Sequence, residues 1–266
     1  DMETGNVFWS RDRRIYAYDA NADYVSQIFN GESTIGWIGG LGFMNGDLYF
    51  TDQDRYTLNK LSWNGSSFDK SLVAGVENQA KEGYIDNWAT TTSFDEASFN
   101  RPSHVTPDPA NNRLFISMGY WNWNNWDQKG RIFVVDLDTN TVSELETLRR
   151  FLSELSPRGY VEFGKPGIDS SGNLYIPTTN GGNTVVKVGF NDDGTFDGVK
   201  STISDDRINN PQSVAVVGGS LYIANMNSYT VDKVGLGASI EIPAMSVTNN
   251  ITLSAFKDPL FEEDEV

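Results

Sequence analysis

Five short apolar strands recur along the chain, and each is followed by a polar loop and a second strand with alternating apolar positions. Apolar residues at every second position indicate half-buried β-strands, and the β-branched and aromatic residues that dominate here favour the same structure. The pattern therefore predicts an all-β chain with an internal repeat. The five recurring strands are residues 7–9, 48–50, 114–116, 174–176 and 221–223.

Tight turns and two further strands complete the repeat. Four of the five strands follow a turn built from glycine or asparagine, such as Asn45-Gly46-Asp47 and Gly218-Gly219-Ser220. These residues tolerate the positive φ that a tight hairpin requires. In three copies another short strand precedes the turn, and in most copies a fourth strand follows, such as 71–73. Four strands in a repeat of roughly 50 residues are typical of a β-propeller blade.

Several segments carry a family resemblance. Residues 46–52, which contain Leu48-Tyr49-Phe50-Thr51-Asp52, resemble the YWTD repeat of lipoprotein-receptor propellers. Residues 99–116 and 210–225 resemble NHL repeats. The resemblance implies a propeller of the TolB-like superfamily, whose members usually have six blades. These motifs indicate a fold and say little about chemistry.

We therefore expect an all-β propeller of four-stranded antiparallel blades, with five recognisable blades and five or six in total. The first copy lacks its inner strand. The segment 251–256 is predicted to supply that strand and close the ring, which would remove exposed sheet edges. The expected boundaries are a single domain over residues 1–258 and an acidic tail over 259–266.

The charge of the chain limits its partners. Acidic residues outnumber basic ones 36 to 20, which gives a formal net charge of −16. Such a surface repels phosphate backbones, so nucleic acid is excluded as a partner. No apolar run is long enough to insert into a membrane. Two glycosylation sequons, at Asn64 and Asn250, fit a secretory route. We expect an extracellular or secreted protein, with the periplasm and the cell surface included.

Three long insertions are predicted to share one face of the ring. They cover residues 76–101, 119–130 and 144–165, and all lie next to the third repeat. Strands alternate in direction, so loops after second strands and loops between blades emerge on the same side. Aromatic side chains beside hydrogen-bonding groups bind sugar rings and protein surfaces; the alternative is that these rings pack beneath the neighbouring insertions. The candidate ligand-binding residues of the middle insertion are Tyr120, Trp121, Trp123, Trp126 and Asp127.

Residues near the predicted central channel offer other chemistry. The single histidine, His104, lies at the start of an inner strand, where it could contact a ligand or make a structural hydrogen bond. The chain lacks a Gly-x-Ser-x-Gly nucleophile motif. Carboxylate and amide oxygens at the channel mouth could bind Ca²⁺, although such residues also stabilise turns. The candidate metal ligands are Asp52, Asp54, Asn180 and Asn225.

Two functions fit these observations. The first is an extracellular binding or structural-interaction propeller, whose carbohydrate or protein ligand lies on the face formed by the three insertions. The alternative is a calcium-dependent hydrolase, similar to lactonases, with its site at the mouth of the channel. No cofactor is required by the first, whereas the second would use Ca²⁺.

Overall fold

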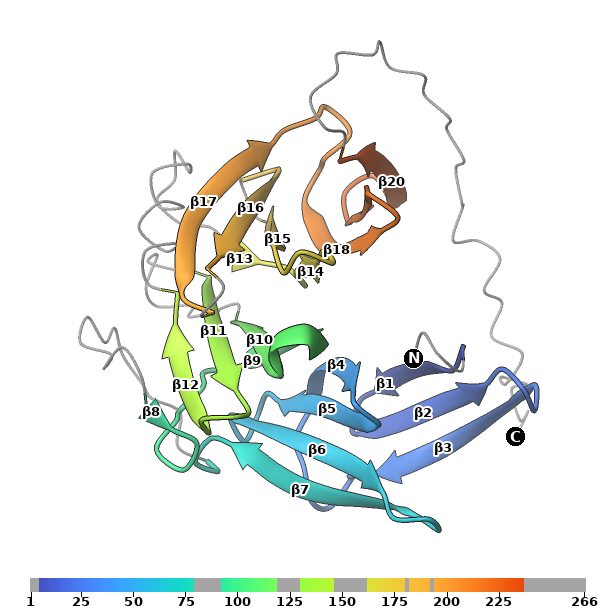
Figure 1. Cartoon of the computed structure of the whole chain (residues 1–266). Coiled ribbons are helices and arrows are strands. Elements are labelled where there is room, and N and C mark those ends of the chain that lie inside the picture. The colour runs from blue at the N-terminus through green and yellow to red at the C-terminus, as the bar shows by residue number, and fades with distance from the viewer. Residues whose placement is uncertain are drawn as a thin grey trace.

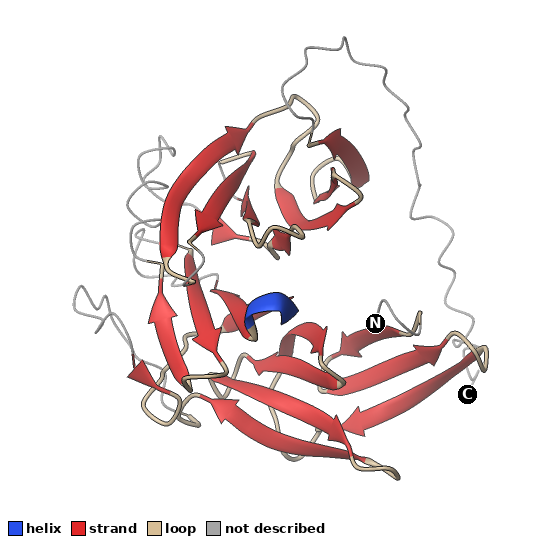
Figure 2. Cartoon of the chain, in the orientation of Figure 1, coloured by secondary structure: helices blue, strands red, loops and turns tan. Residues whose placement is uncertain are grey.

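Five antiparallel sheets surround a common centre and form blades 1 to 5 of a β-propeller (Figure 1). The structure is a computed structural model, and it describes residues 5–78, 92–118, 130–145, 162–179, 182–191 and 194–236. Strands dominate this part of the chain, and its helical element is one short 3-10 turn, η1 (Pro109–Asn111) (Figure 2). The prediction of an all-β propeller is confirmed.

The blades follow one another in chain order. Blade 1 contains β1 (Val7–Arg11), β2 (Arg14–Asp19) and β3 (Tyr24–Asn30). Blade 2 contains β4 (Ile38–Met44), β5 (Asp47–Asp52), β6 (Thr57–Trp63) and β7 (Phe68–Ala74). Blade 3 contains β8 (Thr92–Ser93), β9 (Pro102–Asp108), β10 (Arg113–Met118), β11 (Arg131–Asp136) and β12 (Thr141–Glu144). Blade 4 contains β13 (Glu162–Phe163), β14 (Gly167–Ile168), β15 (Leu174–Thr179), β16 (Thr184–Phe190) and β17 (Phe196–Ile203). Blade 5 contains β18 (Pro211–Val217), β19 (Ser220–Asn225) and β20 (Thr230–Gly235).

The blades depart from the expected four strands, since blades 1 and 5 have three strands each in the described chain. Two further details concern blades 3 and 4. Strand β8 pairs with β12 and adds a fifth strand to the outer edge of blade 3. The inner strand of blade 4 is divided into β13 and β14, since the backbone of Lys165 bonds to blade 5 instead of to β15. Pro166 has no N–H to donate at the same point. Neither detail is visible in the hydrophobic pattern, because both depend on contacts between blades.

Hydrophobic clusters join each blade to the next from blade 1 to blade 5. Phe50 lies in the cluster between blades 1 and 2, and Phe133 in that between blades 2 and 3. Ile176 and Leu221 lie in the clusters between blades 3 and 4 and between blades 4 and 5. Each of these side chains is fully buried. The fold is therefore stabilised by apolar burial between sheets.

The junction of blade 5 with blade 1 has no such cluster among the residues that the structure describes. On β1, Val7 and Trp9 are 55% and 37% exposed, and Trp9 stacks on Tyr16 at 5.7 Å between ring centroids. Blade 1 lacks an inner strand in the described chain, as predicted from the sequence. The segment 251–256, which is predicted to supply it, lies outside the described residues.

The hairpin turns fix the direction of the strands. Asn45 and Gly46 both have positive φ, at 53° and 83°, and they reverse the chain between β4 and β5. This is the geometry that matches the twist of paired strands. The inner strands β4, β9 and β18 thus begin on the same face of the ring on which β5, β10 and β19 end. We call this side the insertion face, because the insertions at 76–101, 119–130 and 144–165 leave the ring there.

Candidate binding face and axial residues

The strand ends from which the three insertions leave are in contact around blade 3. The backbone N–H of Asn100, at the end of the first insertion, donates to Met118 Sδ at 3.2 Å. Arg131 and Glu144, which follow the second insertion and precede the third, form a nearly buried ion pair at 3.1 Å. Gly130 packs against Phe163, whose ring would lie 2.6 Å from a Cβ at position 130. The insertions therefore start and end within one region of the insertion face.

The candidate ligand-binding residues of the middle insertion lie outside the described residues. This applies to Tyr120, Trp121, Trp123, Trp126 and Asp127. Apolar residues at 145, 148, 151, 152 and 155 also predict a short helix, and of this segment only the buried Leu145 is described. Their assignment to ligand binding stays a prediction.

Exposed apolar side chains also mark the insertion face at blades 2 and 5. Trp37, just before β4, is 51% exposed. Met226 and Tyr229, in the loop between β19 and β20, are 57% and 82% exposed. Sequence reasoning missed these three residues, because they lie in short loops and only the fold shows which side of the ring those loops occupy. Contiguous exposed apolar patches mark interaction surfaces, whereas single exposed apolar residues are common on any protein.

The candidate metal ligands at the channel mouth hold loops in place. Asp52 accepts hydrogen bonds from the backbone N–H groups of Gly36, Asp54 and Arg55, at 2.9, 3.2 and 3.0 Å. Asp54 accepts one from the N–H of Trp37 at 3.1 Å. The two carboxylates thus fix the loop that carries Trp37.

Asn225 has a similar role in blade 5. Its amide group donates to the carbonyl of Arg207 at 3.1 Å and to Asp232 at 2.8 Å, and its side-chain oxygen accepts from the N–H of Asn209 at 3.1 Å. Asn180 lies outside the described residues. Within the described ranges, no three side chains of histidine, cysteine, aspartate or glutamate form a group that could hold a metal ion. Calcium binding stays a prediction.

His104 lies on β9, the inner strand of blade 3, and Lys165 lies between β13 and β14 of blade 4. The Lys165 ammonium donates to the carbonyl of Leu41 on β4 at 3.1 Å, so this side chain reaches from blade 4 to blade 2. Burial lowers the pKa of Lys165. Burial, and secondarily the charge of Lys165, lower the pKa of His104 to about 4. Sequence analysis selected His104 but missed Lys165, because a lysine beside Gly164 and Pro166 resembles an ordinary exposed loop residue.

The pKa of His104 predicts a loss of stability in mild acid. The folded protein keeps this imidazole neutral down to about pH 4, whereas an unfolded chain binds the proton near the usual histidine pKa of 6.5. The free energy of unfolding should therefore fall as the pH drops from 6.5 towards 4. Because the chain has one histidine, its NMR titration gives this pKa directly. A measured pKa near 6.5 would contradict the burial of the imidazole. In H104Q the free energy of unfolding, measured with urea, should fall less between pH 6.5 and pH 4 than in the wild type.

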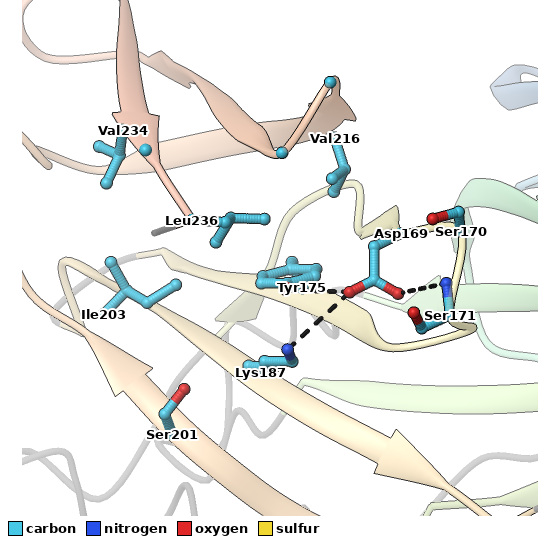
Figure 3. Close-up of a pocket in the computed structure, with 13 residues that line it drawn as sticks. Asp169, Ser170, Ser171, Tyr175, Lys187, Ser201, Ile203, Val216, Val234 and Leu236 are labelled. Carbon is cyan, nitrogen blue, oxygen red and sulfur yellow. Dashed lines mark hydrogen bonds and ion pairs between the residues drawn. The ribbon is translucent and has the colours of Figure 1, made fainter. Parts of the chain in front are cut away.

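A cavity of about 590 Å³ lies between blades 4 and 5, on the face opposite the insertions (Figure 3). Its polar side includes Asp169, whose Oδ2 accepts from the Tyr175 hydroxyl at 3.1 Å and lies 3.9 Å from Lys187 Nζ. Burial raises the pKa of Asp169, but hydrogen bonds from Asn173, Tyr175 and Ser171 outweigh it, so the pKa is lowered overall. Ile203 and Leu236 contribute to the apolar side.

The position of this cavity has a structural explanation. At the junction of blades 3 and 4, the corresponding space is filled by β17, whose Phe196 packs beside Phe190 at 6.1 Å between ring centroids. Blade 5 has three strands in the described chain, and the cavity lies where a fourth would lie. The cavity therefore carries no functional assignment.

Comparison with solved structures supports the same fold. A chain in the crystal structure of a nidogen/laminin complex is 14% identical, with a TM-score of 0.59, over 88% of this chain and 73% of that chain. The luciferin-regenerating enzyme is 12% identical, with the same TM-score, over 89% of this chain and 70% of that chain. The extracellular domain of a protein from B. thetaiotaomicron is 12% identical, with a TM-score of 0.51, over 86% of this chain and 26% of that chain.

This chain has the β-propeller fold. The predicted resemblance to NHL and YWTD-type propellers is confirmed at the level of the fold, and the matched structures include both a complex and an enzyme. No protein-family model and no curated protein matches the sequence. Such low identities establish architecture and leave function to the residues of the site.

In the part of the chain that the structure describes, no helix has the length and apolar character needed to cross a membrane.

Proposed function

We propose that the chain is an extracellular binding propeller whose ligand, a protein or a carbohydrate, lies on the insertion face. The observation that carries the proposal is the convergence of the three insertion ends around Met118 and Gly130. Loops held on a rigid scaffold commonly form binding sites. The middle loop contributes three tryptophans within six positions, which is a composition suited to ligand contact.

Two further observations support this assignment. Trp37, Met226 and Tyr229 extend the apolar character of the same face to blades 2 and 5. A chain of similar fold comes from the nidogen/laminin complex, which supports a protein as the ligand class. An extracellular location is part of the proposal, and it agrees with the extracellular domain of similar fold from B. thetaiotaomicron.

Single replacement of Trp121, Trp123 or Trp126 by alanine tests the proposal. Loss of an aromatic side chain at the centre of an interface commonly costs about 2 kcal/mol or more, which corresponds to at least about a tenfold loss of affinity. Retention on a glycan array and on an array of extracellular proteins should fall by this factor for at least one variant. The melting temperature should change little, because a binding side chain does not stabilise the free protein.

The matched control is W63A. Trp63 is 55% exposed at the end of β6, on the face opposite the insertions, so its replacement should leave retention unchanged. If the three insertion variants instead melt at much lower temperatures, their rings pack beneath the neighbouring insertions. If retention is unchanged in all of them, the ligand does not contact this segment.

The alternative function is a calcium-dependent hydrolase at the channel mouth. The observation in its favour is that an oxygen of Asp52 and an oxygen of Asp54 lie close to each other. Each would be 2.7 Å from a Cβ at position 36. Melting temperatures in calcium and in chelator distinguish the two functions, because a bound ion stabilises the folded state. Equal melting temperatures would count against the hydrolase.

A further inference from the structure

Polar side chains of β9 and β10 lie near the insertion face, on one side of the blade 3 sheet. His104 and Ser117 lie directly opposite each other in the pairing of β9 with β10, so both side chains project from the same side of the sheet. Thr106, two residues further along β9, faces the same side and donates to the carbonyl of Pro166 at 2.7 Å. That side is therefore the one that contacts blade 4 beside Lys165.

The position of Lys165 brings its ammonium close to His104. The backbone of Gly40 packs on the Cα of His104, where a Cβ at position 40 would lie 2.7 Å away. The next carbonyl along β4, that of Leu41, accepts the hydrogen bond from Lys165. The charge of Lys165 also acts on the titration of His104, as expected of neighbouring groups. His104 and Lys165 both keep partial solvent exposure, so a ligand can approach them from the mouth.

The Lys165 ammonium has more hydrogen-bond donors than it has partners among the described residues. The ammonium of Lys165 has three N–H groups, and one of them donates to Leu41. No carboxylate within the described ranges forms an ion pair with it, although acidic residues exceed basic ones across the chain. An ammonium that is largely removed from water normally pairs with an anion.

Ser117 provides an independent observation. Its side chain is fully buried, and its hydroxyl has no hydrogen-bond partner among the described residues. Buried hydroxyls that lack a partner are rare in native proteins, because each loses its hydrogen bonds to water. Because Ser117 pairs with His104, its hydroxyl lies on the same side of the sheet as the imidazole.

We propose that His104, Ser117 and Lys165 form a binding site for a small carboxylate at the axial mouth. One carboxylate oxygen accepts from the Lys165 ammonium, and the other accepts from the imidazole N–H of His104. The Ser117 hydroxyl donates from beneath. The neutral imidazole retains the N–H that this arrangement needs. The site goes beyond the proposed function, since it does not require the tryptophan-containing insertion.

An NMR titration with sodium acetate at constant ionic strength tests the proposal, with sodium chloride as the reference salt. The single histidine gives one set of imidazole resonances. Acetate should move these resonances along a saturable curve, and K165M should weaken the affinity about tenfold or more, because a hydrogen bond to a charged group is lost. S117A should weaken it less. Acetate should raise the melting temperature of the wild type, and it should raise that of S117A by less and that of K165M by least.

The control is K187M, which removes a lysine of the same blade on the opposite face and should bind acetate as the wild type does. Unchanged imidazole resonances in the wild type would overturn the proposal, and so would equal affinities in K165M and the wild type. If K165M fails to fold, the wild-type titration and S117A still decide. A W121A/W123A/W126A protein should bind acetate as the wild type does. The acetate titration therefore tests this site independently of the array experiment, whatever the arrays show.

Discussion

Replacing Asp108 with alanine should destabilise the propeller by about 3 to 5 kcal/mol, the cost of leaving a buried charge unpaired. Asp108 Oδ2 accepts from Arg113 Nε at 2.7 Å, and the two side chains are 3% and 5% exposed. The guanidinium also donates to the carbonyl of Gly194 at 3.0 Å and lies 4.2 Å from the ring centroid of Phe190. It therefore cannot move into water without disrupting blade 4. Urea unfolding measures the change.

Two variants make this result specific. D108A/R113M removes both charges and leaves an apolar chain against Phe190, so it should recover part of the stability lost in D108A. D205A breaks the exposed pair of Asp205 with Arg207 and should cost at most about 1 kcal/mol. A D108A protein as stable as D205A would show that the Arg113 charge is solvated.

Replacing Gly164 with alanine should destabilise the protein by about 3 kcal/mol or more and lower the melting temperature by about 6 to 12 °C. A Cβ at this position would lie 2.1 Å from the carbonyl oxygen of Gln212 and 2.6 Å from its carbonyl carbon. Backbone atoms cannot rotate away as a side chain can. The adjacent hydrogen bonds between Lys165 and blade 5, at 2.8 and 3.0 Å, would lengthen or break. Differential scanning calorimetry gives the shift.

The matched control is G235A at the end of β20. A Cβ there has no atom within 4 Å among its described surroundings, so the substitution should change stability by less than about 1 kcal/mol. Equal melting temperatures for G164A and G235A would contradict the close approach of blades 4 and 5.

The blades themselves could be predicted from local pattern. Alternating apolar residues and turns such as Asn45-Gly46 predicted β5, β6 and β7 of blade 2, whereas its inner strand β4 was not predicted. The sequence Asn191-Asp192-Asp193-Gly194-Thr195 predicts a hairpin turn, and β16 and β17 pair on either side of it. Strand β8 was missed, because two residues carry no detectable periodicity. Its formation depends on the free edge of β12, which only the folded blade provides.

The candidate site could be predicted only in part. His104 was selected because it is the one histidine and begins an inner strand. Its neighbour Lys165 is distant in sequence, and nothing near Lys165 indicates that its ammonium reaches a carbonyl of blade 2. Ser117 lies in an apolar strand, where a serine gives no sign of an unsatisfied hydroxyl. Asp52 and Asp54 were selected as oxygen ligands, and the structure shows that they also bind the backbone that carries Trp37.

The sequence alone determined the all-β class, the repeat and the order of the blades, because strand periodicity and turn chemistry act over a few residues. Tertiary structure decided which side chains meet at the axis and which exposed aromatic groups share a face. These outcomes depend on how five sheets pack around a centre. Leu41, His104 and Lys165 belong to three different blades and are distant in sequence, so only the packing of the blades makes them neighbours.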